Sequence, residues 1–541
     1  MDAKRKYLLL LLLIGSLVFL FKLGGRDLWD PDEPRYAAIA REMRQSGDWI
    51  APHLHGQIYL EKPPLFFWLV NLSTFAFGNS ELANRLPSGL AGLAVVVLTF
   101  ILGSRLFGPE AGFLSGLVLA SGFYFPQISR WMMLDSLLTL CFLLSLAFLY
   151  FGLNRPERQR TYSLLAGVCM ACGILAKGPL AYLPVPLMLI YTLMSRDFRK
   201  IWNRNLLYSV LLSVGVVFVW FLPAVNRIGE SYGTDNLWLQ TVGYFIGGRN
   251  HPEPLYLYFA RFPFDFLPWT LFLPWAFVSG YRQIKSEKRK EVLFLFVWFA
   301  FLFLFFSLSK AKKENYLLPL YPAAALGLGN WLAPHWRSSG KVAERLDELW
   351  IPVMLITLLS VLAGAIILLS PVGWFPATAV SFFPYVLGAI SCILVGGALS
   401  LLFALKRRQV ASISCFIAGL IAAHVYVSTV FIPWINPARS AKPFSQEILR
   451  RMTPGDELKI WKFRHQGILY YTGKPVEQIK KIDRLLEVLS GPGRVFVVAE
   501  EQDLAELNER TALLYHVIEK RKVAHQMLFL ISNKARSRVS P

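Results

Sequence analysis

Long apolar runs recur along this chain and restrict what it can fold into. They begin near residue 7 and continue to about residue 433, and many are 17 or more residues long. A run of that length can cross the hydrocarbon core of a bilayer as a helix. Only 17% of the 541 residues are charged, against about 25% in a typical soluble domain. The chain is therefore predicted to be a polytopic membrane protein.

The apolar runs predict about thirteen transmembrane helices. The predicted segments are 7–23, 87–107, 110–126, 133–152, 162–176, 179–195, 206–226, 266–281, 291–308, 315–333, 350–370, 380–404 and 410–433. Lys and Arg gather in the connectors on the same side as the N-terminus, as the positive-inside rule expects of cytoplasmic loops. These basic connectors are 154–161, 195–205, 281–291 and 406–408. With an odd number of helices, the C-terminal region then lies on the opposite side.

Two parts are predicted: an all-α membrane domain at 1–434 and a small soluble α/β domain at 435–541. The membrane domain carries two long outer loops, 24–86 and 226–265, which are too polar to span. The first loop should hold a short helix opened by Asp32-Glu33-Pro34, because apolar residues follow at helical spacing. The tail is predicted to form strands at 458–463, 494–499, 515–520 and 527–532 and helices at 476–489 and 502–510.

The net charge of +21 would ordinarily suggest nucleic-acid binding. Most of the basic residues, however, lie in the short connectors between apolar runs, where membrane topology places them. Nucleic acid is therefore excluded as a partner, and anionic lipid headgroups are expected to meet part of the excess charge.

Polar residues with catalytic potential gather in the predicted outer loops. Asp32 and Arg35 stand in the segment 29–36, Trp-Asp-Pro-Asp-Glu-Pro-Arg-Tyr, and helix capping by Asp32 is an equally good explanation taken alone. Glu61 and Lys62 precede Pro63-Pro64, where an interfacial turn with snorkelling charges is the alternative. Asp135 lies at the start of a predicted helix, and an ionisable group so close to hydrocarbon is a functional candidate, with capping of that helix as the alternative.

Further candidates break the positive-inside pattern or offer metal ligands. Lys177 and the stretch 309–316, with Lys310 and Lys313, place cations on the outer side, which an anionic lipid phosphate would explain and a topology error would also produce. Arg249 and His251 lie in the second long loop, where the histidine could bind a divalent metal together with Glu61 or could simply be solvated.

Four segments together resemble the ArnT family of lipid A aminoarabinose transferases, within the GT-C superfamily. They are Trp-Asp-Pro-Asp-Glu-Pro-Arg-Tyr-Ala at 29–37, Ile-Tyr-Leu-Glu-Lys-Pro-Pro at 58–64, Leu-Asp at 134–135 and Lys-x-x-Tyr-Leu-Leu-Pro at 313–319. The resemblance covers nearly the whole chain. It implies a GT-C fold with about thirteen helices and a C-terminal periplasmic domain. It also implies transfer of a sugar from an undecaprenyl phosphate carrier to lipid A at the periplasmic face of the bacterial inner membrane.

The resemblance also implies roles for single residues. Asp32 and Asp135 match the catalytic acids, and Glu61 and His251 resemble a pair that binds a divalent metal, with zinc the metal suggested. The positions that resemble carrier-phosphate or substrate contacts are Arg35, Tyr59, Lys62, Lys177, Arg249, Lys310, Lys313 and Tyr316. The expected partners are the polyprenyl-phosphate sugar, a lipid A or other glycolipid acceptor and membrane lipids, and the protein is expected to be a monomer.

The sequence departs from the family pattern at two places. Pro34 stands where aminoarabinose transferases commonly have Thr, and the loop 247–254 differs from the expected pattern. The sugar and the acceptor therefore stay open, and another carrier-linked sugar moved to protein or to another glycan is the alternative. A lipid or sugar transporter, from a different class, would place charges near the bilayer midplane, whereas the charges here cluster in outer loops.

Overall fold

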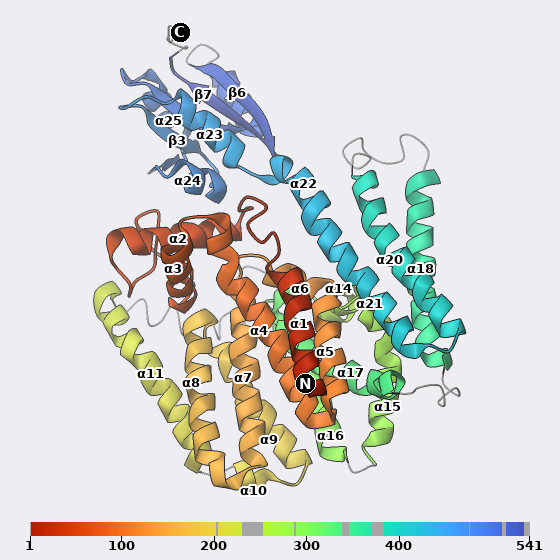
Figure 1. Cartoon of the computed structure of the whole chain (residues 1–541). Helices are drawn as coiled ribbons and strands as arrows, with labels where there is room; N and C mark the ends of the chain where they lie inside the picture. The colour runs from red at the N-terminus through yellow and green to blue at the C-terminus, as the bar shows by residue number, and fades with distance from the viewer. Residues whose placement is uncertain are drawn as a thin grey trace. The chain divides into compact units, whose positions relative to one another are not determined.

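The structure is a computed structural model, shown in Figure 1, that describes residues 2–201, 204–229, 253–285, 288–337, 346–369, 382–474, 476–510 and 515–534. The chain divides into two compact units. The first, called the helical unit, comprises residues 1–23, 60–78 and 82–431. The second, called the mixed unit, comprises residues 24–59, 79–81 and 432–541. Residues 24–59 and 79–81 of the predicted first loop, 24–86, thus share a compact unit with the C-terminal region, although the sequence predicted the whole loop as part of the membrane domain.

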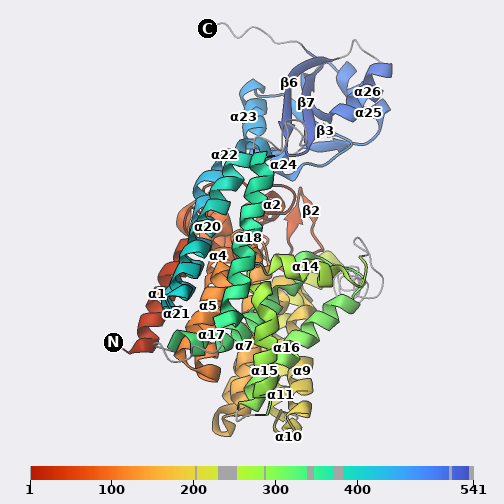
Figure 2. The same cartoon turned by 90° about the vertical axis from the view of Figure 1, so that its right-hand side faces the viewer.

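Within the described residues, seven helices of the helical unit are long and apolar enough to cross a membrane. They are α4 (Glu81–Phe107), α7 (Asp135–Leu153), α11 (Arg204–Ile228), α16 (Arg289–Leu308), α18 (Leu346–Leu369), α20 (Phe383–Leu405) and the helix that begins as α21 (Gln409–Tyr426). Shorter helices lie among them: α1 (Ala3–Phe19), α3 (Leu65–Phe77), α5 (Pro109–Ser121), α6 (Tyr124–Ser129), α8 (Gln159–Lys177), α9 (Pro184–Met194), α14 (Leu257–Asp265), α15 (Leu273–Gln283) and α17 (Tyr321–Arg337). In Figures 1 and 2, most of the long helices run in roughly one direction.

A helix lies at each of the thirteen predicted segments, but the count of thirteen spans is not confirmed. Several segments are shorter than one span, because proline interrupts them. The predicted 179–195, for example, begins as a 3-10 turn at Pro179–Tyr182, and α9 starts only at Pro184. Leu65–Phe77 forms the 13-residue helix α3, which is shorter than the bilayer is thick.

Small residues allow the helices to approach closely at the centre of the helical unit. A Cβ atom added to Gly103 of α4 would lie 2.8 Å from the Cα of Gly112 in α5. On α17, a Cβ at Gly329 would overlap the side chain of Ser115 and lie 2.7 Å from its backbone nitrogen. In a lipid environment, where apolar side chains gain little by leaving lipid for protein, such close backbone contact is a main source of helix association.

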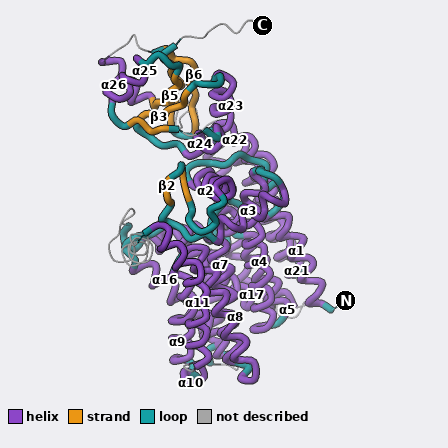
Figure 3. The backbone as a smooth tube through the Cα atoms, turned by 90° about the vertical axis from the view of Figure 1, so that its left-hand side faces the viewer, coloured by secondary structure: helices purple, strands orange, loops and turns teal. Residues whose placement is uncertain are grey.

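The mixed unit combines helices with a five-stranded sheet of order β4-β3-β5-β7-β6, seen as orange strands in Figure 3. Its elements are α2 (Asp32–Ser46), the hairpin β1 (His53–Leu54) and β2 (Gln57–Ile58), α22 (Ile432–Arg439), α23 (Lys442–Arg451), β3 (Glu457–Trp461), α24 (Gln466–Thr472), β4 (Glu477–Ile479), α25 (Ile482–Ser490), β5 (Val495–Glu500), α26 (Glu501–Arg510), β6 (His516–Val523) and β7 (Gln526–Ser532). Strand β3 pairs in parallel with β4 and β5, whereas β7 pairs antiparallel with β5 and β6.

Helices cover both faces of this sheet. Phe496 and Val498 of β5 pack in one apolar cluster with residues of α23 and α24. Val495 and Val497 point to the other face and pack with residues of α25 and α26. A central strand buried on both faces reads as a continuous apolar run, which is why the sequence identified β5 readily.

The C-terminal α/β domain is confirmed, with one element wrong. The predicted helix at 476–489 begins instead as the strand β4, and the helix α25 starts at Ile482. Residues Glu477–Ile479 adopt an extended strand conformation because pairing with β3 gives their backbone N–H and C=O groups hydrogen-bond partners. The short helix α24 was not predicted.

Gly329→Ala tests the close contact of α17 with α5. The added methyl group has no space beside Ser115, so we expect a loss of about 1–3 kcal/mol of stability. Gly327→Ala, two residues away on the same helix, has open space around its Cβ and should be neutral or slightly stabilising. Thermal unfolding of the detergent-solubilised chains measures both, and equal midpoints for the two variants would contradict this packing.

Candidate functional site

Asp32 and Arg35 lie together at the start of α2 in the mixed unit. Asp32 is the first residue of the helix, and Arg35, one turn later, forms an ion pair with it. Their side chains keep 25% and 23% of their exposure. The Arg35 guanidinium also lies 5.2 Å from the centre of the Tyr36 ring. The result is an accessible acid and cation, a pair suited to an anionic phosphate and to a developing positive charge.

Glu33, between these two, is entirely buried and plays a structural part. Arg26 donates two hydrogen bonds to its carboxylate, at 2.5 and 3.1 Å. The backbone nitrogen of Trp29 donates a third, at 3.0 Å. The apolar stripe of Tyr36, Ile39, Ala40 and Met43 is also buried, and Tyr36 and Ala40 lie on the same face of the helix as Glu33. Glu33 thus anchors the helix start, and Asp32 stays at the surface.

The segment before α2 is bonded to the C-terminal part of the mixed unit. Asn436 accepts hydrogen bonds from the Asp27 nitrogen at 3.0 Å and from the Trp29 indole at 2.9 Å. The Tyr471 hydroxyl accepts one from the Leu28 nitrogen at 2.7 Å. These long-range bonds satisfy backbone groups that a loop would otherwise expose to water. Asn436 and Tyr471 were missed as supporting residues, since nothing in the local sequence marks them.

A second cluster forms in the helical unit around Asp135. Asp135 is the first residue of α7 and is 4% exposed. Lys177, the last residue of α8, forms an ion pair with one carboxylate oxygen, and the Asn315 amide donates to the other at 2.9 Å. The Lys177 nitrogen lies 5.2 Å from the centre of the Tyr316 ring. The structure thus brings together three predicted residues, Asp135, Lys177 and Tyr316, that are far apart in the sequence.

Asn315 belongs to the 3-10 helix η5 (Glu314–Leu320) and was not predicted as a site residue. Its neighbour Glu314 forms an ion pair with Arg261 of α14, and Arg261 also lies 3.9 Å from Asp265. Two adjacent residues of η5 therefore contact different charged groups of the helical unit: Asn315 contacts Asp135, and Glu314 contacts Arg261. A signal existed, because both residues fall inside the outer basic stretch 309–316, where only the cations were singled out.

The three lysines of that stretch differ. Lys312 is 3% exposed, and its ammonium donates to the carbonyl oxygens of Glu253 and Ser309, at 3.0 and 2.5 Å. Lys310 and Lys313 are exposed. Lys312 thus helps to fold the connector, and the two predicted cations Lys310 and Lys313 remain at the surface.

Glu61 and Lys62 follow one another at the start of the helical unit's second segment. Glu61 is exposed, and the Lys62 ammonium donates to the Glu61 carbonyl oxygen at 3.0 Å. Tyr59 belongs to the mixed unit, where it is buried and its nitrogen donates to the Pro52 oxygen at 2.8 Å. The roles suggested for these three residues stay predictions.

The proposed metal pair is only half described. Arg249 and His251 lie outside the described residues, so the partner expected for Glu61 has no described position. Among the residues that the structure describes, no group of three His, Cys, Asp or Glu side chains lies close enough to hold a metal ion. The described residues therefore do not provide a zinc site by themselves, and the zinc stays a prediction.

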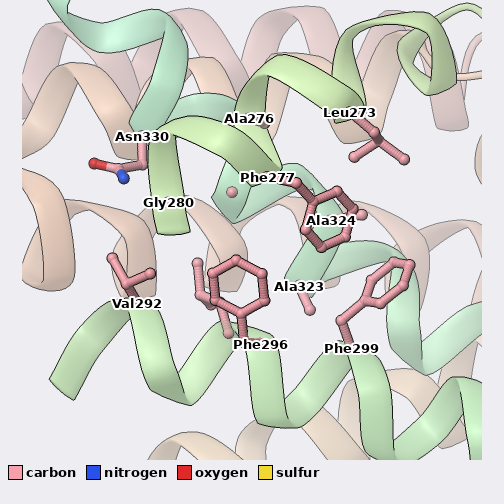
Figure 4. A pocket seen from close by; sticks show the side chains of 12 residues that line it. Leu273, Ala276, Phe277, Gly280, Val292, Phe296, Phe299, Ala323, Ala324 and Asn330 are labelled. Atoms are coloured by element: carbon pink, nitrogen blue, oxygen red, sulfur yellow. The ribbon is translucent and has the colours of Figure 1, made fainter. Parts of the chain in front are cut away.

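The helical unit also contains an apolar pocket between α15, α16 and α17 (Figure 4). It comprises about 440 Å³ of space, part of it open. Phe277, Phe296 and Phe299 line it, with Asn330 as its polar residue. The Asn330 amide donates to the Gln283 side chain at 3.0 Å, so its polar group is already satisfied.

Comparisons with known proteins found one family model and several curated relatives that match parts of this chain. The family model described as dolichyl-phosphate-mannose-protein mannosyltransferase matches residues 61–225. An undecaprenyl phosphate-alpha-4-amino-4-deoxy-L-arabinose arabinosyl transferase 2 of Proteus mirabilis is 33% identical over 325 residues, which are 59% of this chain and 58% of that protein. A Pseudomonas aeruginosa protein with the corresponding transferase name is 32% identical over 349 residues, 63% of this chain and 62% of that protein.

The fold agrees over the whole chain. The crystal structure of ArnT from Cupriavidus metallidurans bound to undecaprenyl phosphate superimposes with a TM-score of 0.83, at 20% identity, and covers 100% of both chains. This chain therefore resembles the ArnT transferases in part of its sequence and in its whole fold. The archaeal oligosaccharyltransferase AglB from Archaeoglobus fulgidus matches with a TM-score of 0.53 at 12% identity, over 92% of this chain and 69% of that one. The fold is therefore of the GT-C type.

The sequence match to the ArnT transferases is partial. The aligned region spans about three fifths of the length of the curated relatives it matches. The fold is thus established, and the predicted multi-pass membrane character agrees with it. The reaction, the substrates and the roles of single residues need their own argument.

Lys177→Met tests whether Asp135 depends on its cation. The change leaves a buried carboxylate with Asn315 as its hydrogen-bond donor, and breaking a buried ion pair costs about 3–5 kcal/mol. Adding Asp135→Asn removes the unpaired charge and should restore most of the stability. Lys285→Met, at an exposed position, is the control. Thermal unfolding in detergent measures all four chains, and a single variant as stable as wild type would contradict the pairing.

His465 predicts a pH dependence of the mixed unit. Burial holds the pKa of His465 below its ordinary 6.5, although the Asp30 carboxylate partly opposes this, while Glu500 and His525 also act on the ring. The His465 imidazole therefore binds a proton more tightly in the unfolded chain than in the folded unit. The free energy of unfolding should fall as the pH drops below about 6.5. In the His465→Asn variant, which has no imidazole at this position, the free energy of unfolding should fall less over the same pH range.

Hydrogen exchange of the β5 amides in the full chain, corrected for intrinsic rates, measures this between about pH 7 and 5.5. Burial raises the pKa of Asp30 above its ordinary 3.8. Protonation of Asp30 at lower pH therefore favours the folded unit, which opposes the effect of His465. For this reason the comparison is made at pH values where Asp30 does not titrate in the unfolded chain. Equal slopes for the wild type and His465→Asn would contradict the assignment.

Proposed function

We propose that this protein is an integral membrane glycosyltransferase. It moves a sugar, best assigned as 4-amino-4-deoxy-L-arabinose, from undecaprenyl phosphate to lipid A at the periplasmic face of the bacterial inner membrane. The observation that carries the proposal is the 33% identity over 325 residues with a protein named as such a transferase. The N-terminus is cytoplasmic and the C-terminal domain periplasmic, in agreement with the basic connectors.

The two described clusters have the chemistry that the reaction requires. When the bond between the sugar and the carrier phosphate breaks, the phosphate leaves as an anion and positive charge develops on the sugar. Arg35 is the cation proposed to hold the departing phosphate, with Lys62 as a second contact. Asp32 is proposed to stabilise the developing positive charge or to orient the acceptor, and Asp135 supports it as the second acid.

The acceptor decides how much base catalysis is needed. A lipid A phosphate is already ionised near neutral pH and attacks without losing a proton. A hydroxyl acceptor would require Asp32 to take its proton in the transition state. The match of residues 61–225 to a family described as protein mannosyltransferases favours protein hydroxyls as the second candidate acceptor.

Mass spectrometry of lipid A tests the proposal, in a host that makes the carrier-linked aminoarabinose. Cells with the wild-type protein should show a pentosamine mass increment that cells without it lack. Asp32→Asn should reduce the increment at least about 100-fold, the usual contribution of a positioned catalytic acid or base. Glu509→Gln, an equal charge change at an exposed residue of the mixed unit, should leave it unchanged.

Two outcomes would count against the proposal. A wild-type protein that folds but adds no pentosamine would remove aminoarabinose transfer to lipid A as its activity. Full transfer by Asp32→Asn would remove Asp32 from the catalytic residues.

A further inference from the structure

The structure places the segment before Asp32 directly against α24 of the C-terminal domain. Both carboxylate oxygens of Asp30 accept from the Gly467 nitrogen, at 3.0 and 3.1 Å. The His465 Nδ1 lies 3.1 Å from Asp30 Oδ2. Asp30 is two residues from Asp32, so the position of one strongly limits the position of the other. A seven-residue helix of one domain thus faces the catalytic segment of a loop more than 400 residues away in the sequence.

Other contacts from the same helix reach the loop on both sides of Asp32. The Tyr470 carbonyl oxygen accepts from Arg41 at 2.8 Å, and the Arg41 guanidinium lies 4.8 Å from the Tyr470 ring. The Gln466 side chain lies 3.0 Å from the His55 ring nitrogen Nε2. Residues 465–471 therefore contact the loop before α2, along α2 and at the hairpin that follows.

The contact with Asp30 depends on two features of α24. His465 is 4% exposed, and Asp30 is the acid that faces its Nδ1. Gly467 lies so close that an added Cβ would overlap Asp30 Oδ2 and come within 2.8 Å of the Ala441 Cβ. Its helical backbone has no need of glycine for conformational reasons, so glycine is needed there for space.

We infer that His465 and Gly467 are positioning residues: through Asp30 they hold Asp32 and Arg35 in the geometry that sugar transfer requires. The C-terminal domain then acts as the support of the catalytic loop. The inference rests on the proposed function only for its catalytic consequence. That consequence can be large, because a misplacement of about 1 Å can lower a rate about 100-fold.

Hydrogen exchange measured by mass spectrometry tests the positioning without any assay of activity. In the full-length protein in detergent, His465→Ala and Gly467→Ala should speed the exchange of amides 29–36 about tenfold or more, because the first removes the contact of the ring with Asp30 and the second displaces the Asp30 carboxylate. His516→Ala and Gly493→Ala, at an exposed histidine and a glycine with open space in the same unit, are the matched controls. They should exchange as the wild type does.

The β5 amides are the internal reference in the same experiment. A purely structural role would speed exchange throughout the sheet as well, and that result would overturn the inference. Unchanged exchange at 29–36 in both variants would also overturn it.

Turnover links the positioning to catalysis. His465→Ala and Gly467→Ala should lower kcat for transfer about 10- to 100-fold, while His465→Asn, which keeps a polar nitrogen near the position of Nδ1, should recover part of it. A lower kcat with unchanged exchange would overturn the inference. If the wild-type protein transfers no sugar, the proposed function fails, and the exchange result still decides whether α24 positions the loop.

Discussion

A charge removed from water has to be paired, and both clusters of this protein follow from that constraint. Asp135 is tolerable at the buried start of α7 because Lys177 and Asn315 satisfy its two oxygens. Glu33 is tolerable at zero exposure because Arg26 and the Trp29 nitrogen complete its hydrogen bonds. The Asp135 contacts join helix ends that are far apart in the sequence, whereas the Glu33 contacts are local and fix the segment before α2 against the start of that helix.

The same requirement explains why the first loop shares a compact unit with the C-terminal region. A loop exposes backbone donors that need partners, and Asn436 and Tyr471 accept those of Asp27 and Leu28. The sheet behind them is rigid, since β5 is buried on both faces and helices cover each side. An acid that must act at a set position gains from a support of this kind, because a site held by packed elements is better ordered than one held by a loop alone.

Local patterns identified the elements that depend on local physics. The stripe Tyr36, Ile39, Ala40 and Met43 predicted α2 and its buried face, and the apolar run of β5 predicted a central strand. The pattern failed at 476–489, where pairing with β3 overrode a helical sequence, and at α24, where seven residues give too weak a periodic signal. The count of thirteen spans stays a prediction, because proline and 3-10 turns divide several apolar segments into helices shorter than a bilayer is thick.

The sequence by itself determined the membrane class, the two-part composition, the family resemblance and the residue types of the site, because these depend on composition, periodicity and short motifs. It could not separate Asp30, Asp32 and Glu33, three carboxylates within four residues. Only the tertiary structure assigned Glu33 to Arg26, Asp30 to His465 and Gly467, and left Asp32 at the surface with Arg35. The physical reason is that the burial of a side chain and the choice among its possible partners depend on the folded packing, in which even distant residues such as His465 and Gly467 take part, and these decide what an ionisable side chain can do.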